Sequence, residues 1–278
     1  MKSISKTDQL SAKRSLNING NLLDLSKPLI MGIVNMTPDS FYDGGNYNSK
    51  DKALKRIEKM VQNGTSIIDI GGCSTRPGSE IVSIDEEWNR IKEIIRICSL
   101  KFNKIIISVD TFRSEIARRS LEEGASIIND VSGGSYDNKM FSVISEYKIP
   151  YVLMHIRGTP KNMMSKINYD NLIVDIMDYF IKKIEKLKSM NVNDIILDPG
   201  FGFAKDFDQN FELLKNLNFL TTFDLPILVG LSRKSFVKNK YGIKNSLHGT
   251  IELNKIALKN GADIIRVHDV KEHLKLIK

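Results

Sequence analysis

The sequence predicts an α/β fold, a single (β/α)8 TIM barrel with an N-terminal β-hairpin that covers the bottom of the barrel. Eight short apolar runs alternate with segments of mixed charge and helical spacing, which is the order of strands and helices in such a barrel. No linker rich in proline or glycine interrupts this order, and 278 residues suit one large barrel. We therefore expect one domain over residues 16–278, behind a flexible N-terminal tail at 1–15.

The elements follow in chain order from the hairpin. Residues 16–25 alternate around Asn19-Gly20, a pair that accepts the positive φ of a tight turn. Apolar runs then predict strands at 29–35, 66–71, 105–109, 126–129, 151–155, 194–197, 226–230 and 263–267. Helices are expected between them at 50–63, 84–100, 113–123, 138–147, 169–190, 208–219 and 247–260, with a short last one near 270–277.

Composition narrows the class of protein. The net charge of +8 suits an anionic small substrate and also nucleic acid, but no aromatic residues interleave with a basic stripe. Cys73 and Cys98 are too few for a disulfide framework and lack metal-ligand spacing, which indicates a reducing compartment. The first fifteen residues lack the apolar core of a signal peptide, and no apolar run reaches membrane-spanning length. We expect a cytoplasmic protein that binds neither nucleic acid nor membrane.

Polar residues follow nearly every predicted strand. In chain order they are Asn35, Gly71-Gly72, Asp110, Asn129-Asp130, His155, Asp198, Ser232-Arg233-Lys234-Ser235, Arg266 and His268. In a barrel of this kind those positions converge on one mouth, which is where such folds do their chemistry. One such residue is often a cap or a turn, but a polar group behind nearly every strand is better explained by a shared ligand.

The last predicted strand carries a candidate anion site. Arg266 and His268 alternate with apolar neighbours and therefore project from one face of the strand. An arginine can bind an oxyanion in bidentate fashion, and the histidine would add a second donor. Alternatively, Arg266 pairs with a carboxylate and His268 caps a helix; these two residues taken alone do not decide between the alternatives.

Two predicted loops, at 37–45 and 72–80, are longer than a tight βα turn needs and are rich in glycine and proline. Such loops can close over a substrate. Turn chemistry alone would explain the glycines and prolines, but it does not explain why Phe41, Asp43 and Arg76 are there.

Eight stretches, taken in order, resemble the dihydropteroate synthase family of the folate pathway. They are MGIVNMTPDSFYDGG (31–45), STRPG (74–78), SVDT (108–111), INDV (128–131), MHIRGTP (154–160), DPGFGF (198–203), GLSRKS (230–235) and RVHDV (266–270). The resemblance implies condensation of 6-hydroxymethyl-7,8-dihydropterin pyrophosphate with p-aminobenzoate, giving 7,8-dihydropteroate and pyrophosphate. It further implies loss of pyrophosphate to a pterin-methyl cation before the aryl amine attacks, Mg²⁺ as cofactor, a homodimer, and sulfonamides as mimics of p-aminobenzoate.

The resemblance also implies roles for the matching residues. The pterin would contact Asp110, Asn129, Met154, Asp198, Phe203 and Lys234. Pyrophosphate would contact Asn35, Thr75, Arg266 and His268, and the Asn35 side chain would hold Mg²⁺. The p-aminobenzoate pocket would be shaped by Phe41, Thr75, Pro77 and Ser235, with Phe203 beside them. The implied catalytic residues are Asp43, Arg76 and Lys234.

Simple chemistry supports the assignment of Asp198. A pterin edge carries an N–H beside an amino group, so an ionised carboxylate can accept two charge-assisted hydrogen bonds from it. Two alternatives stay open: the carboxylates and lysine could form a structural ion-pair network across the barrel, and Asn35 could be a turn residue only.

Two related functions compete with this assignment. The first is a pterin-binding methyltransferase domain, which shares the barrel but would need neither the two loops nor the pair Arg266 and His268. The second is a barrel of the same fold without catalytic activity. One residue also departs from the family, because Cys73 stands where many relatives carry glutamate. We expect the Cys73 thiol to serve in packing, since no step of the chemistry requires it as a nucleophile.

Overall fold

Eight parallel strands form the centre of the molecule. The computed structural model describes residues 14–37, 46–74 and 81–277. The strands are β3 (Leu29–Asn35), β4 (Ile67–Gly71), β5 (Ile106–Asp110), β6 (Ile127–Asp130), β7 (Tyr151–Met154), β8 (Ile195–Asp198), β9 (Leu228–Val229) and β10 (Ile264–Val267). They pair in the order β8-β7-β6-β5-β4-β3-β10-β9, and a parallel bridge between Leu197 and Ile227 joins the two ends. The predicted barrel is therefore confirmed.

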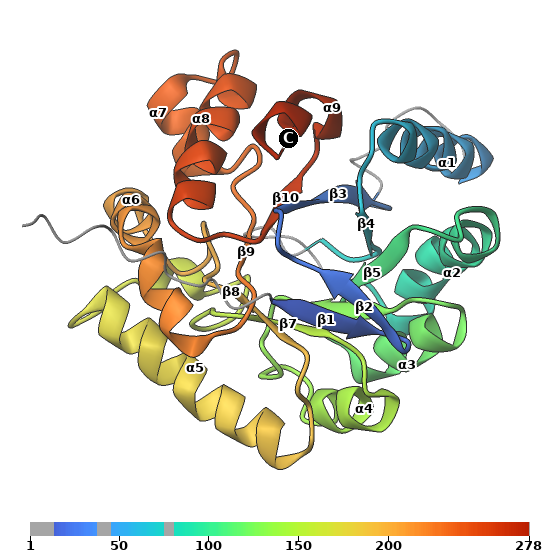
Figure 1. Ribbon diagram of the computed structural model, residues 1–278, viewed down its shortest axis with the longest axis horizontal. Helices are drawn as coiled ribbons and strands as arrows, with labels where there is room; N and C mark the ends of the chain where they lie inside the picture. The colour runs from blue at the N-terminus through green and yellow to red at the C-terminus, as the bar shows by residue number, and fades with distance from the viewer. Residues whose placement is uncertain (1–13, 38–45, 75–80, 278) are drawn as a thin grey trace, which may run out of the picture.

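Helices surround the strands as an outer ring (Figure 1). They are α1 (Asn46–Gln62), α2 (Ile84–Lys101), α3 (Ser114–Glu122), α4 (Met140–Tyr147), α5 (Leu172–Ser189), α6 (Phe207–Lys215), α7 (Ser235–Tyr241), α8 (Ser246–Lys259) and α9 (Val270–His273). Short 3-10 turns lie at η2 (Met163–Ser165), η3 (Leu217–Phe223) and η4 (Leu274–Leu276). Within the described ranges, none of the helices has the length and apolarity to cross a membrane.

Several predicted boundaries were wrong. The helix expected at 208–219 ends at Lys215, because the Asn216 side chain donates to the Glu212 carbonyl at 2.9 Å and the chain continues as η3. The helix expected near 270–277 is α9 followed by η4, and the helix expected from 50 begins at Asn46. The strand expected at 226–230 is reduced to β9, which follows a proline that lacks an N–H for the ladder. Helix α7 was not predicted at all.

The N-terminal hairpin closes one end of the barrel, as predicted. Strands β1 (Ser15–Ile18) and β2 (Asn21–Asp24) pair across Asn19 and Gly20, whose φ values of 50° and 86° are both positive. Leu16, Ile18 and Leu25 pack into one buried cluster with barrel residues. Those barrel residues are Met31, Ile67, Ile127, Val152, Ile196, Leu228 and Ile264. The cluster forms the floor of the barrel.

The last two residues of the predicted tail are part of the fold. Residues 1–13 are outside the described ranges. Arg14, however, donates to Asp263 Oδ2 at 2.8 Å, and Ser15 is the first residue of β1.

The alternation of the strands places polar residues directly above this floor. Side chains two positions apart point to the same face of a strand, so the residues two positions after the floor residues also face inward. Besides Ile33 and Gly230, these residues are Asp69, Asn129, Met154, Asp198 and Arg266. The same geometry that packs the floor thus collects carboxylate, amide and guanidinium groups inside the carboxyl-terminal half of the barrel.

Candidate active site

A fully buried carboxylate, Asp69, connects three residues inside the barrel. Arg266 Nε donates to Asp69 Oδ2 at 2.6 Å, and Asn129 Nδ2 donates to the same oxygen at 3.0 Å. Ser108 Oγ donates to the other oxygen at 2.6 Å. Because a carboxylate paired with arginine only accepts hydrogen bonds, Asn129 must turn its amide nitrogen toward Asp69 and its amide oxygen away. Asp69 therefore decides which polar atom Asn129 presents elsewhere.

Asp110 lies at the end of β5 on the other side of the same arginine. Arg266 Nη2 donates to Asp110 Oδ2 at 2.8 Å. The second oxygen, Oδ1, is buried and has no hydrogen-bond partner in the described part of the chain. An unsatisfied buried acceptor costs about 1–3 kcal/mol, so this oxygen is a place where a ligand donor would be stabilising. Burial raises the pKa of Asp110 to about 7; nearby carboxylates add to this, and Arg266 opposes it.

Asp198 ends β8 and is held by its own loop. The Gly200 N–H donates to Asp198 Oδ1 at 2.7 Å. Burial raises the pKa of Asp198, while the Gly200 hydrogen bond and the charges of Lys234 and Arg266 lower it. The charges of both cations, which come from separate strand ends, thus act on this carboxylate. This places Asp198, Lys234 and Arg266 around one site.

Lys234 lies against an aromatic ring from the loop after β8. Its Nζ is 4.0 Å from the centroid of Phe203, a cation–π distance. A Cβ at Gly202 would lie 3.1 Å from the Lys234 Cδ, so the absence of a side chain at this glycine leaves room for the lysine. Lys234 is also the residue immediately before α7, with extended backbone.

An apolar wall borders these polar groups. Its buried members are Cys73, Phe112, Val131, Met154, Ile156, Met163 and Ala204, and Phe203 packs against them. Cys73 is 8% exposed, and burial raises the pKa of its thiol, which agrees with the expected packing role.

Hydrogen bonds tie the ends of β9 and β10 together beside the site. The His268 N–H donates to Ser232 Oγ at 3.2 Å, and Ser232 Oγ lies 2.9 Å from His268 Nδ1. Arg233 pairs with Asp269 through two hydrogen bonds, of 3.1 and 2.6 Å. Arg56, from α1, donates to the His268 carbonyl at 3.2 Å. These contacts fix the position of the histidine.

Asn35 ends β3 and faces Asp110 across Gly71. A Cβ at Gly71 would lie 3.5 Å from Asn35 Oδ1 and 3.3 Å from the Asp110 Cβ. The glycine therefore lets an amide oxygen and a carboxylate approach the same space. Within the described ranges, no group of three His, Cys, Asp or Glu residues could hold a metal by itself.

Of the predicted site residues, the structure brings Asp110, Asn129, Asp198, Lys234 and Arg266 together around one site. Ser235 is exposed and begins α7. Asn35, Met154, Phe203 and His268 lie at the positions given above, and five further predicted residues lie outside the described residues: Phe41, Asp43, Thr75, Arg76 and Pro77.

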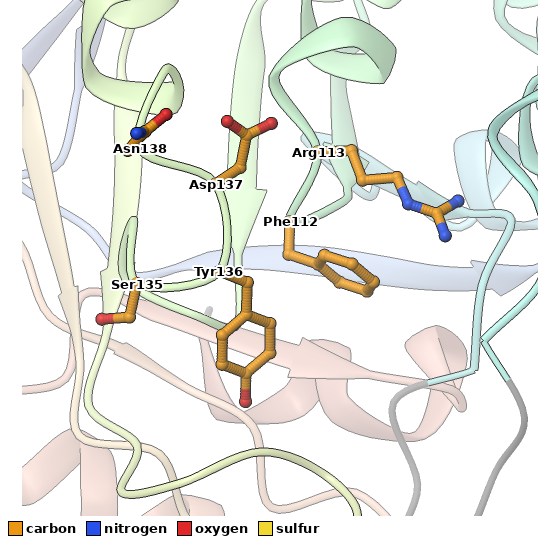
Figure 2. Close-up of a pocket in the computed structure, with 6 residues that line it drawn as sticks. All are labelled: Phe112, Arg113, Ser135, Tyr136, Asp137 and Asn138. Carbon is orange, nitrogen blue, oxygen red and sulfur yellow. The ribbon is translucent and has the colours of Figure 1, made fainter.

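A surface cavity of about 450 Å³ shares Phe112 with the apolar wall (Figure 2). It is lined by Phe112, Arg113, Ser135, Tyr136, Asp137 and Asn138. Phe112 and Tyr136 meet edge to face with centroids 5.5 Å apart. Its charged groups already have partners, since Arg113 pairs with Glu87 and Asp137 accepts from the Ser114 N–H. The cavity contains none of the predicted site residues.

Two site residues were missed in the sequence. Asp69 had a signal, because it interrupts a run of isoleucines at an inward-facing position. Lys205 had none, because a lysine in a loop is ordinarily exposed; here it is 2% exposed.

Comparison with known proteins agrees with this geometry. A family model described as pterin binding enzyme matches residues 31–268. The dihydropteroate synthase of Synechocystis is 41% identical over 283 residues, which cover 99% of this chain and 98% of that protein. The chain belongs to the dihydropteroate synthase family of pterin-binding enzymes. This membership favours dihydropteroate synthase over the methyltransferase alternative.

Solved dihydropteroate synthases share the whole fold. The Yersinia pestis enzyme, solved with a sulfonamide drug complex, has a TM-score of 0.88 at 40% identity, covering 95% of this chain and 96% of that one. The Xanthomonas albilineans enzyme, solved with 4-aminobenzoic acid, has a TM-score of 0.89 at 31% identity, covering 96% of both chains.

Proposed function

We propose that the chain condenses 6-hydroxymethyl-7,8-dihydropterin pyrophosphate with p-aminobenzoate to form 7,8-dihydropteroate and pyrophosphate, a step of folate synthesis. Membership of the dihydropteroate synthase family supports the activity. The observation that carries the placement of the substrate is the buried, unpartnered Asp110 Oδ1 beside Arg266. Such an oxygen needs an N–H donor, and a pterin ring supplies several.

In this proposal, the pterin lies inside the barrel and is held through hydrogen bonds to its polar edge. The Asp198 carboxylate accepts the ring N–H and amino group as two charge-assisted hydrogen bonds. Asp110 Oδ1 and the Asn129 amide oxygen accept further N–H groups, and Lys234 donates to a ring acceptor. Met154 and Phe203 lie in or beside the apolar wall, which supports contact with the ring faces. Buried polar groups of this kind discriminate strongly against rings that leave them unpaired.

Arg266 and His268 would hold the leaving pyrophosphate. A guanidinium has five N–H donors, and Asp69 and Asp110 use two of those of Arg266 in the structure. Arg266 can therefore pair with carboxylates and still contact a phosphate. His268 is positioned by Ser232 at the end of β10. Thr75 from the second loop would complete this set.

The reaction exchanges a C–O bond for a C–N bond at the pterin methyl carbon. Pyrophosphate leaves with the electron pair of the C–O bond, the resulting cation is delocalised into the pterin ring, and the aryl amine donates its lone pair to the methyl carbon. The amine then loses a proton to solvent. Fixed donors at the leaving oxygens lower this barrier because they need no reorganisation when charge develops. Asp43 would stabilise the cation, and Arg76 would hold pyrophosphate or p-aminobenzoate.

Phe41, Pro77 and Ser235 would line the p-aminobenzoate pocket together with Thr75. The exposed position of Ser235 at the start of α7, next to Lys234, supports an entry path for the second substrate beside the pterin. The 4-aminobenzoic acid bound by the Xanthomonas albilineans relative supports this substrate class.

Mg²⁺ fits the residues present at Asn35. The Asn35 amide oxygen would supply one ligand, and phosphate oxygens and water would supply the rest, which suits an ion that retains water and takes few protein ligands. When bound, Mg²⁺ neutralises charge on the departing pyrophosphate. Titration of Mg²⁺ into an assay of Asn35→Ala, which should need more Mg²⁺ for half-maximal rate, tests this assignment.

The proposal includes a homodimer in the cytoplasm. Phe207, Ile243 and Ile256 are large apolar residues exposed on or between the neighbouring helices α6, α7 and α8, which supports an interface there. Both cysteines are free and buried, as suits a reducing compartment. Light scattering of the purified chain would contradict the dimer by giving the monomer mass.

A coupled pyrophosphate-release assay tests the proposed activity. We expect sustained release only when both substrates and Mg²⁺ are present, with formation of dihydropteroate in equal amount. Absence of product with both substrates, or transfer of a methyl group from methyltetrahydrofolate instead, would contradict it.

A further inference from the structure

Lys205 is a buried cation to which the proposed mechanism gives no task. It lies seven residues after Asp198, in the loop that follows β8, and its side chain is 2% exposed. Its Nζ lies 3.0 Å from His155 Nδ1, 3.1 Å from the Gly200 carbonyl and 3.0 Å from the Phe203 carbonyl. No carboxylate of the described residues is hydrogen-bonded to it. An ammonium placed among neutral acceptors at this depth needs a reason, because burying it costs solvation free energy.

The three acceptors connect Lys205 to the pterin site. Gly200 donates its N–H to Asp198 Oδ1 at 2.7 Å, so Lys205 holds one end of the peptide segment that orients the carboxylate. Phe203, whose carbonyl Lys205 also holds, carries the ring beside the Lys234 ammonium. One amine thus positions the backbone at both ends of the short segment between the proposed pterin carboxylate and its neighbouring ring.

The loop is also held from its other neighbours, since the Gly202 N–H donates to Asn210 Oδ1 at 2.7 Å and the Tyr169 hydroxyl donates to the Ala204 carbonyl at 2.8 Å, but neither bond holds the Gly200 or Phe203 carbonyl. Gly200 adopts a φ of +72°, and a Cβ there would lie 2.0 Å from the His155 carbonyl, so the loop runs in close contact with the end of β7. His155 itself is 1% exposed and packs edge to face against Tyr179, with ring centroids 5.0 Å apart. The histidine ring is therefore held in a fixed position, where it contacts the Lys205 amine.

Burial and neighbouring charges set the pKa values of Lys205 and His155. Burial lowers the pKa of Lys205 to about 7; Asp198 opposes this shift, while Lys234 and Arg157 add to it. Burial also lowers the pKa of His155 well below its usual value, so the ring is neutral and can accept from the ammonium at Nδ1. The charges of Lys205 and Arg157 lower the pKa of His155 further, and the neighbouring Tyr169 and Tyr179 stay protonated because burial raises their pKa values.

We propose that Lys205 is a positioning residue of the pterin site, whose ammonium holds the Gly200 and Phe203 carbonyls and thereby aims the Asp198 carboxylate. The proposal rests on the proposed function, because it assigns the loop's shape to pterin binding. When the ammonium loses its proton it keeps only two N–H donors for three acceptors, and His155 must become the donor. The loop is then held less firmly, and pterin affinity falls.

The test measures the binding of 6-hydroxymethyl-7,8-dihydropterin to the whole chain by calorimetry, from about pH 6 to about pH 8.5, on either side of the Lys205 pKa. In the wild type we expect affinity to rise with pH as Asp110 ionises, and to fall again as Lys205 deprotonates. Lys205→Met should lose the alkaline fall, keep the acid rise, and bind about 10- to 100-fold more weakly at its optimum, as a lost charged hydrogen bond predicts. Titration of the ligand itself is common to both proteins and cancels in their ratio.

The exposed Lys215 on α6 offers a matched control, since Lys215→Met removes a lysine without touching the loop. This variant should keep both the rise and the fall of pterin affinity with pH. The KM for p-aminobenzoate should change less than twofold in Lys205→Met. An alkaline fall that persists in Lys205→Met, or unchanged pterin affinity in a folded variant, overturns the proposal. If Lys205→Met does not fold, the wild-type profile still decides, because binding without an alkaline fall also overturns it. Absence of any pterin binding by the wild type would instead overturn the proposed function, and this inference with it.

Discussion

Arg266 donates from Nε to Asp69 at 2.6 Å, joining residues 197 positions apart in the chain inside the barrel. The same guanidinium reaches Asp110 through Nη2. One cation between two carboxylates, with one carboxylate oxygen left without a partner, makes a site that is electrostatically assembled before a substrate arrives. Pairing of Arg266 with a carboxylate is the alternative that the sequence left open, and in the proposed function the unpartnered Asp110 oxygen accepts a hydrogen bond from the pterin.

Replacing Asp69 tests whether this carboxylate orients Asn129 and Arg266 in the site. Asp69→Asn lets the Asn129 amide turn either way and removes one partner of Arg266, so we expect the pterin KM to rise by roughly tenfold or more while the p-aminobenzoate KM is unchanged. Ser108→Ala removes only a hydrogen bond to the same carboxylate and should cost about 1 kcal/mol of stability without this change in KM. Steady-state kinetics with each substrate varied, beside urea unfolding, separate the two effects; equal KM values for wild type and Asp69→Asn would refute the role.

Replacing Asp198 tests the pterin carboxylate, and the same strand supplies a control. Asp198→Asn should weaken pterin binding roughly 100-fold, because one acceptor becomes a donor facing an N–H group. Asp194, before the other end of β8, accepts from the Asn17 N–H of the hairpin at 2.8 Å and lies far from the mouth. Asp194→Asn should therefore leave pterin affinity unchanged. Calorimetric titration of both variants checks this, and similar losses in the two would remove Asp198 from the site.

The pH dependence of stability should report on Asp110. Its pKa is raised to about 7 in the folded chain, from an ordinary value near 4 when unfolded. A group with a raised folded pKa contributes stability that is fully present below its unfolded pKa and is lost as pH rises through its folded pKa. We therefore expect this contribution to fall between about pH 4 and about pH 7, and Asp110→Asn to abolish that fall. Urea unfolding of both proteins at a series of pH values measures the difference; parallel curves would show that Asp110 is not buried in this way.

Glycine at position 200 should be irreplaceable for reasons of space. A Cβ there would lie 2.0 Å from the His155 carbonyl in addition to the positive φ, so Gly200→Ala should destabilise the chain by about 2–5 kcal/mol. Gly64 also has a positive φ, but its nearest described neighbour is Leu274 Cδ2 at 3.8 Å. Gly64→Ala should cost only the backbone term, about 1–2 kcal/mol. Thermal unfolding of the pair isolates the clash, and equal costs would mean that the loop can move away from β7.

Local patterns in the chain were sufficient for the barrel and for most of the site. Asn19 and Gly20 specify the hairpin because few other residues tolerate positive φ at both positions. The β-branched runs specify the strands, and their two-residue period places Asp110, Asn129, Asp198 and Arg266 at one end. Helix α7 was not predicted because its seven residues make only about two turns, which leave almost no periodic signal.

By itself, then, the sequence determined the order of strands and helices, the family, and which polar side chains meet at the mouth, because each depends on local conformation and on the alternation of side chains. Only the tertiary structure decided how those polar groups pair. Whether Arg266 meets Asp69, which way Asn129 turns its amide, and that Lys205 is buried beneath the loop all depend on distances between strands that are remote in the chain. Hydrogen bonds and charge interactions act over a few ångströms of space, and the spacing of residues along the chain does not specify those distances.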